Sequence, residues 1–287
     1  MPSKKAIKLR RTGVRTIKQI VKAMNMVATT KLQRIKVRLL ATRPMFQEVK
    51  RMMDQLKRNG DAGRHLYFKD PTGKRAAYVL ITSNRGLCGS YNSNVSSAML
   101  RHMETAEKEE SIIAIGSRGR DYFSRRGKRI VHCYQDLTEN ALYTDLHQVG
   151  KQLMDLYVSG EVDEVYVAYT HFDTVLSHVP RVVRLLPIGS EDGDEEAATE
   201  PCGMQFESDL DTVLEHALPL YLSAFLYGAL QEAGSSEQAA RMLSMDAASK
   251  NASEIIDDLT RMYNRKRQAG ITQEITEIVS GANVNKQ

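Results

Sequence analysis

One segment of this 287-residue chain combines small, polar and cationic residues in a pattern that could hold a phosphate group. It reads TSNRGLCGSYNSN from Thr82 to Asn94, follows an apolar β-rich run and precedes a helical pattern. Parallel α/β folds bind phosphates at such a strand-to-helix turn. The segment lacks both G-x-x-x-x-G-K-S/T and G-x-G-x-x-G. Two interpretations therefore stay open: a nucleotide-binding enzyme that uses Gly86–Gly89, and a tight turn without a ligand.

The remaining residues that could take part in catalysis or metal binding form no recognisable set. The seven histidines are scattered, and Asp145 with His147 is typical of a helix surface. Cys88, Cys133 and Cys202 are far apart with no CxxC, which favours a reducing compartment over a disulfide framework or a zinc site. We expect no catalytic residue, no metal and no cofactor.

Charge is unevenly distributed along the chain. Residues 1–60 hold 17 Lys or Arg against two acids, whereas residues 191–215 hold ten acids and no Lys or Arg. This asymmetry suggests acidic partners or nucleic-acid binding. Because neither aromatic stacking platforms nor a base-reading motif accompany the basic segment, a basic coiled-coil nucleic-acid protein is the weaker alternative.

The middle of the chain alternates short β-rich runs with stretches of helical length. This alternation predicts a small Rossmann-like α/β domain of about five mostly parallel strands over residues 75–190. The predicted strands are Ala76–Thr82, Ile112–Ile115, Ile130–Val131, Val165–Tyr169 and Val182–Leu186, with crossover helices around 92–110, 117–127 and 139–160.

Long helices are predicted on both sides of that domain, at 1–58 and 207–284, with an acidic connector at 191–206. Apolar or small residues recur every three or four positions in both, as in an antiparallel coiled coil. The first seam reads Val14, Ile17, Val21, Met24, Ala28, Leu32, Ile35, Leu39, Thr42, Phe46, Val49, Met53 and Leu56; the second includes Met242, Met245, Ala248, Ala252, Ile255, Leu259, Met262 and Ala269.

Three irregularities are expected in these helices. The two successive four-residue steps from Met24 to Leu32 predict a stutter, and Pro44 should bend its helix without ending it. At about 1.5 Å per residue the helices measure about 85 Å and 115 Å, so the C-terminal one should overhang by roughly 30 Å. Its tip, Gln268–Gly281, has only two charged residues and an Ile271, Ile275, Ile278 stripe, which calls for a sleeve from a partner.

No apolar run is judged long enough to span a bilayer, so contact with a membrane is expected only through partners.

Four motifs in order resemble the gamma subunit of the F-type ATP synthase, and the resemblance covers essentially the whole chain. The motifs are IVKAMNMVA at 20–28, TSNRGLCG at 82–89, SEQAARM at 236–242 and YNRKRQAGITQEITEIVSG at 263–281. The resemblance implies a non-catalytic central rotor stalk inside a ring of α and β subunits. Rotation of a membrane c ring by proton flow would turn the stalk, and ATP chemistry would belong to β.

Residue roles carried over from the family are also expectations. Contacts with the β loops that grip the stalk are implied for Arg241, Arg267, Gln268, Thr272 and Glu277, and Met24 lies in the torque-bearing coiled coil. Phe206, Glu207 and Asp209 occupy the foot that touches the c ring. Three departures from the family pattern are Asn84, Ser208 and Gly270, where Asp, Pro and Ser are usual.

The implied partners are the α, β and epsilon subunits and the c ring, with no nucleic acid. No plastid-type dithiol insertion or transit peptide is found, which favours a bacterial enzyme. The implied location is the cytoplasmic face of the bacterial plasma membrane.

Overall fold

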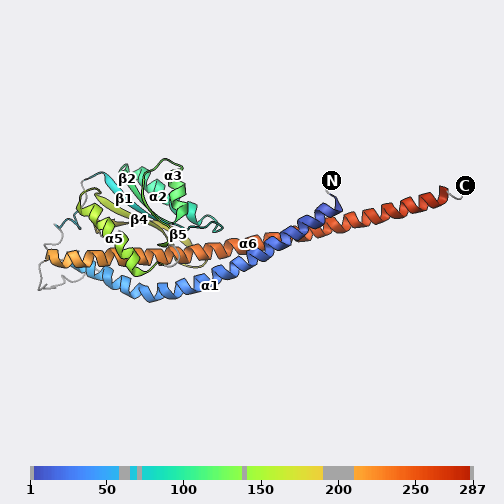
Figure 1. Ribbon diagram of the computed structural model, residues 1–287. Helices are drawn as coiled ribbons and strands as arrows, with labels where there is room; N and C mark the ends of the chain where they lie inside the picture. The colour runs from blue at the N-terminus through green and yellow to red at the C-terminus, as the bar shows by residue number, and fades with distance from the viewer. Residues whose placement is uncertain (1–2, 58–64, 70–72, 138–140, 190–209, 285–287) are drawn as a thin grey trace. The chain divides into compact units, whose positions relative to one another are not determined.

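The structure, a computed structural model, describes residues 3–57, 65–69, 73–137, 141–189 and 210–284. Side chains of 210–211 and 280–284 are outside this description. The elements are α1 (Lys4–Lys57), β1 (Arg75–Ile81), α2 (Tyr91–Ala106), β2 (Glu109–Ile115), α3 (Ser117–Ser124), β3 (Ile130–Tyr134), α5 (Tyr143–Val158), β4 (Glu164–Phe172), β5 (His178–Leu186) and α6 (Leu210–Val284) (Figure 1).

Five strands form one sheet in the order β3-β2-β1-β4-β5. The β1–β2, β1–β4 and β2–β3 pairs are parallel, and β5 runs antiparallel to β4 at one edge. Parallel strands need crossover connections, which α2, α3 and α5 provide. The predicted sheet of about five mostly parallel strands is therefore confirmed.

Side chains of β1 alternate between two hydrophobic layers, as the period of a strand requires. Ala76, Tyr78 and Leu80 pack with residues of α2 and α3, such as Met99 and Phe123. The opposite face of the sheet packs with α5, α6 and the last part of α1, through Val79, Leu153, Leu222 and Met53 among others. Both faces are covered, so β1 is almost continuously apolar.

The described chain consists of two compact units, and both long helices contribute to each. One unit, Thr29–Arg241, contains the sheet. The other, Met1–Ala28 with Met242–Gln287, is a helix pair. The predicted acidic connector, 191–206, lies outside the described residues.

The helix pair is antiparallel. Asn25 Nδ2 donates a hydrogen bond to the Met242 carbonyl at 2.9 Å, and the Arg11 guanidinium lies 5.1 Å from the centre of the Tyr263 ring. Ala28 and Leu259 are buried in the same unit. Every side chain from Ile271 to Val279 is exposed, so the pairing with α1 ends before Ile271. The predicted uncovered stripe is therefore present.

The seam differs in detail from the prediction. Ile17, Ile255 and Met262 are exposed by 57%, 44% and 54%, so their placement in the seam is wrong. The next residue faces inward in each case, and two of the three, Lys18 and Tyr263, are polar or aromatic. The inward positions of this part of α1 are Ile7, Arg11, Val14, Lys18, Val21, Asn25 and Ala28, and those of α6 include Met245, Ala252, Ile256, Leu259 and Tyr263.

With Asn25 as a seam position, steps of four and three residues alternate without interruption into Leu32. The stutter predicted at Met24 is therefore replaced by a regular heptad. Long cationic side chains fit such positions because their aliphatic stems cover apolar surface while the charged ends reach outward. The helix continues through Pro44, as predicted, and Figure 1 shows α1 bending in its light-blue part.

One window of α6 is long and apolar enough to cross a membrane by length and composition, with a mean hydropathy of 1.3. The prediction that no run approaches this length is therefore wrong. Because 61% of the window is buried inside the protein, its apolar character is that of a core helix.

Candidate functional site

The loop between β1 and α2, which carries the first motif, is fastened at its start to the neighbouring strand connection. The Thr82 amide donates to the Ile115 carbonyl at 2.8 Å, and the Thr82 hydroxyl accepts from the Gly119 amide at 2.9 Å. Gly116 adopts φ 99 in contact with Thr82, where a β-carbon would lie 2.2 Å from the Thr82 carbonyl oxygen. Only glycine fits there, which explains Gly116, the first residue of the GSRG turn.

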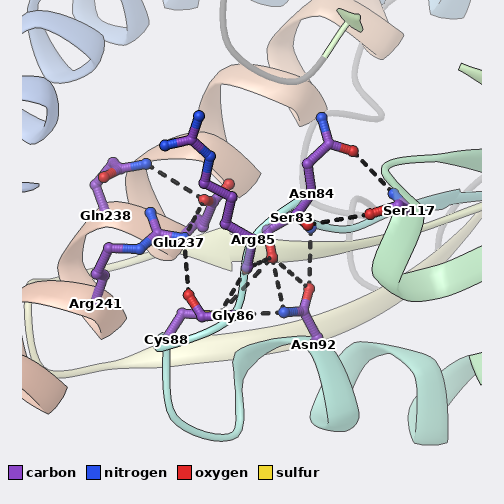
Figure 2. Close-up of polar contacts among 10 residues, drawn as sticks. All are labelled: Ser83, Asn84, Arg85, Gly86, Cys88, Asn92, Ser117, Glu237, Gln238 and Arg241. Atoms are coloured by element: carbon purple, nitrogen blue, oxygen red, sulfur yellow. Dashed lines mark hydrogen bonds and ion pairs between the residues drawn. The ribbon is translucent and has the colours of Figure 1, made fainter. Parts of the chain in front are cut away.

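The side chain of Asn92, in the first turn of α2, forms hydrogen bonds with Ser83 and Cys88 of the loop (Figure 2). Its Oδ1 accepts from the Ser83 amide at 2.9 Å, and its Nδ2 lies 2.8 Å from Ser83 Oγ and 3.2 Å from Cys88 Sγ. Ser83 Oγ also donates to the Arg85 carbonyl at 2.7 Å. The side chains of Ser83, Cys88 and Asn92 are thus engaged in hydrogen bonds with one another and with the loop backbone.

Asn84 extends the same network to the next connection of the sheet. Its Nδ2 donates to the Gln135 carbonyl at 2.6 Å, and its Oδ1 accepts from the Ser117 amide at 2.9 Å. An aspartate here would offer no donor to the Gln135 carbonyl. The departure from the family pattern at this position therefore has a defined structural use.

Cys88 is only 2% exposed in this loop. Burial raises the pKa of its thiol, and the hydrogen bond with Ser83 offsets part of that shift. A buried thiol held in the protonated form is a poor nucleophile at neutral pH. Cys88 therefore behaves as a structural residue.

The loop is joined to α6 by a charged contact. Arg241 Nη2 lies 2.7 Å from Glu237 Oε1 and donates to the Gly86 carbonyl at 3.4 Å. The side chains of Arg241 and Glu237 are 11% and 10% exposed, so the pair is largely withdrawn from water. Burial and then the Glu237 charge raise the pKa of the neighbouring Tyr91 well above its ordinary value.

The other residues expected to contact β lie in the helix-pair unit. Arg267, Gln268, Thr272 and Glu277 are all exposed on α6, on and beyond the last paired turns. Gln273 Nε2 donates to Glu277 Oε1 at 2.9 Å, one turn apart. These four residues therefore lie on the same length of α6 as the Ile271, Ile275 and Ile278 stripe.

Arg241 belongs to the sheet-containing unit and is occupied by contacts within the chain; its contact with β stays a prediction. Met24 is half-buried beside Asn25. The foot residues Phe206, Glu207 and Asp209 lie outside the described residues.

Sequence reasoning did not find Glu237, Asn92 or Asn25 as individual residues with a role. Glu237 could have been found, because a glutamate four residues before an arginine is the spacing of a helical ion pair. Asn92 and Asn25 depend on tertiary contacts that no local pattern encodes. Among the described residues, no group of three His, Cys, Asp or Glu side chains could hold a metal ion.

Fold and site together define a coiled-coil protein with an attached α/β domain, whose uncovered features are an apolar helix end and the polar residues beside it. The model of the ATP synthase family matches residues 3–284. An ATP synthase gamma chain of Alkaliphilus metalliredigens is 40% identical over 98% of both chains. The chain belongs to the ATP synthase gamma chain family.

Solved structures support the fold. A chain of the Euglena gracilis mitochondrial ATP synthase in rotational state 3 has a TM-score of 0.68 and 21% identity, covering 98% of this chain and 94% of that one. A chain from the rotor of the same enzyme in rotational state 1 has a TM-score of 0.64 and 19% identity, covering 93% and 98%.

Proposed function

We propose that this chain is the central-stalk rotor subunit of a proton-translocating ATP synthase of bacterial type and is not catalytic by itself. One observation carries the proposal: Ile271, Ile275 and Ile278 are exposed by 46%, 56% and 71% on one face of α6. An apolar stripe that nothing in the described chain covers requires a partner surface. The relatives named ATP synthase gamma chain and the rotor of like fold support this function.

In this function, proton flow turns a membrane c ring, the ring turns this chain, and the chain turns inside a ring of α and β subunits. The rotor lacks three-fold symmetry, so it presents a different face to each β subunit. Each catalytic site on β is thereby driven through different conformations. ATP chemistry takes place on β, and this chain supplies the mechanical link.

We propose that separate parts of the chain bind separate partners. The β subunits grip Arg267, Gln268, Thr272 and Glu277, with Arg241 as a further contact. Met24 lies in the coiled coil that bears torque. The epsilon subunit and the c ring bind the other end of the rotor, the c ring through the foot formed by Phe206, Glu207 and Asp209. The complex lies at the cytoplasmic face of the plasma membrane.

The direct test replaces the three isoleucines of the stripe by serine in the assembled enzyme. ATP hydrolysis should fall by about tenfold or more, since each buried isoleucine contributes about 1.5–3 kcal/mol to a contact. The matched control is Ala269→Ser with Thr276→Ser, on the opposite, exposed face of the same part of α6. Equal hydrolysis rates for the stripe variant and the control would contradict the proposal.

The absence of catalysis has its own test, because the loop Gly86–Gly89 was the site of the competing enzyme interpretation. Equilibrium dialysis of labelled ATP against the purified full-length chain should show no saturable binding. Saturable binding that is lost on Asn92→Ala, which opens this loop, would favour the nucleotide-binding alternative.

A further inference from the structure

The helix α6 is enclosed on all sides where it passes the loop between β1 and α2. Ser235, Ser236 and Ala239 are fully buried, and Glu237 and Gln238 are 8% and 4% exposed. Five consecutive buried residues cannot belong to one face of a helix. A glutamate at such a place is unfavourable unless it is paired, so its presence calls for an explanation beyond packing.

Arg241 supplies the partner, and it also reaches the α/β domain. The same nitrogen, Nη2, is 2.7 Å from Glu237 Oε1 and 3.4 Å from the Gly86 carbonyl oxygen. Gln238 Nε2 lies 3.4 Å from the same Glu237 oxygen. Figure 2 shows the side chains of Glu237 and Arg241, both from α6, converging on the loop. One guanidinium therefore bridges a helix carboxylate and a loop carbonyl.

The loop side of this bridge is stiff. Leu87 adopts φ 64, a left-handed conformation that is unfavourable for a residue with a side chain. Its side chain is 61% exposed, so packing of that side chain does not account for the conformation. The Asn92 network fixes the residues before it, and the turn directs the Gly86 carbonyl at α6. Backbone strain of this kind persists only where the surroundings hold it.

We infer that Glu237 and Arg241 are positioning residues that lock the β1–α2 loop to α6 and transmit torque between the α/β domain and the helix. Interlocked apolar side chains resist both separation and rotation of the two. A buried, charge-assisted hydrogen bond is directional and resists such rotation. The torque role rests on the proposed rotor function, whereas the locking contact does not.

The first test measures the lock alone, by hydrogen exchange of the loop amides 84–89 in the free full-length chain. Arg241→Ala should raise their exchange about tenfold, the effect of losing a charged hydrogen bond of about 1.4 kcal/mol. The charge swap Glu237→Arg with Arg241→Glu keeps an ion pair on α6 but moves the cation one turn away from Gly86. It should raise exchange as much as Arg241→Ala, and recovery of protection in the swap would overturn the lock.

Ser223→Ala is the matched control, because Ser223 of α6 lies 3.1 Å from His147 of α5 and, among the described residues, forms no hydrogen bond with the loop. Loop exchange in this variant should equal that of the original chain. Unchanged exchange in Arg241→Ala would also overturn the lock.

The second test uses the assembled enzyme in sealed vesicles and measures protons pumped per ATP hydrolysed. Glu237→Gln should lower this ratio at least twofold, and Ser223→Ala should not. A normal ratio for Glu237→Gln, in a chain whose loop exchange has risen, would overturn torque transmission. If the enzyme assembled with the original chain pumps no protons during ATP hydrolysis, both the rotor function and the torque role are contradicted. The hydrogen-exchange data then test the locking contact by themselves.

Discussion

Glu164 is a carboxylate that the fold buries at the start of β4. It is 3% exposed and accepts hydrogen bonds from Lys108 Nζ and from the Tyr166 hydroxyl, the latter at 3.0 Å. Buried ion pairs add little net stability, but removal of one partner leaves a charge without compensation. Lys108 should therefore matter more than its position in a connection suggests.

Lys108→Ala is expected to lower the free energy of unfolding by about 3–5 kcal/mol, because the Glu164 carboxylate loses its cation. The measurement is urea unfolding of the full-length chain at pH 7. The double variant Lys108→Ala with Glu164→Gln removes the uncompensated charge and should recover part of the loss. A double variant as unstable as the single one would contradict this account.

Sequence reasoning at the residue scale succeeded where a role depends on a linear motif and failed where it depends on the fold. The exposed position of Arg267, Gln268, Thr272 and Glu277 agrees with residues available to a partner, although their contacts stay predictions. The engagement of Arg241 with Gly86 was not foreseen, because the two residues are 155 positions apart in sequence.

At the scale of the elements, the neighbouring strands β1 and β4 share an aromatic pair. Tyr78 and Tyr166 stack with ring centres 5.1 Å apart, and His102 of α2 lies 3.1 Å from the Tyr78 hydroxyl. Burial, followed by the Glu164 charge, raises the pKa of Tyr166 to about 12. Burial also raises the pKa of Tyr78 above its ordinary value.

These shifts predict alkaline unfolding. A tyrosine whose pKa is raised by folding retains its proton in the folded state and loses it near pH 10 when unfolded. Its stabilising contribution is thus present below pH 10 and is lost between pH 10 and about 12. The unfolding free energy measured from pH 9 to 11 should fall, and Tyr166→Phe should reduce the slope. The chain has no tryptophan, so tyrosinate absorbance can be followed directly; an unchanged slope in Tyr166→Phe would contradict the prediction.

The helix pair shows how a regular repeat outweighs hydrophobicity at single positions. The sequence pattern placed Ile17 and Met262 in the seam, while the fold uses Lys18 and Tyr263. The strands were easier to predict, because residues buried on both faces give continuous apolar runs. Element type was therefore predictable, but the phase of the helix seam depended on a partner 217 or more residues away.

Asn25 carries a prediction about that phase. A polar residue in a coiled-coil seam fixes the register at a cost in stability. Asn25→Leu should therefore leave the thermal midpoint unchanged or raise it by a few degrees, while the pairing of α1 with α6 becomes less uniform. Spin-label distances between residues 10 and 264 should broaden in this variant. A lower midpoint with a sharp distance distribution would contradict this role.

At the scale of the whole molecule, the two compact units differ in how their helices are supported. The sheet-containing unit encloses α6, whereas α6 beyond Gly270 has only exposed side chains among its described residues. Isolated helices of 12–15 residues are marginal in water. The last turns of α6 should therefore be stable only in complex with partners.

Hydrogen exchange of the free full-length chain can measure this difference. Amides of residues 271–279 should exchange at close to unprotected rates, while those of the buried stretch Ser235–Ala239 should be protected by several orders of magnitude. In the assembled enzyme the tip should become protected. Protection of the tip in the free chain would show that it is covered by the chain itself.

The antiparallel helix pair also has a consequence for how the protein is made. Arg11 and Tyr263, which meet in this pair, are 252 residues apart in the sequence. At about 5–20 residues per second, a ribosome needs roughly ten to fifty seconds to travel between them. Throughout that time the basic, amphipathic start of the chain is outside the ribosome without α6, the helix with which it pairs. The first helix to emerge therefore stays unpaired until α6 has been synthesised. Until translation ends, that helix is exposed to chaperones and proteases.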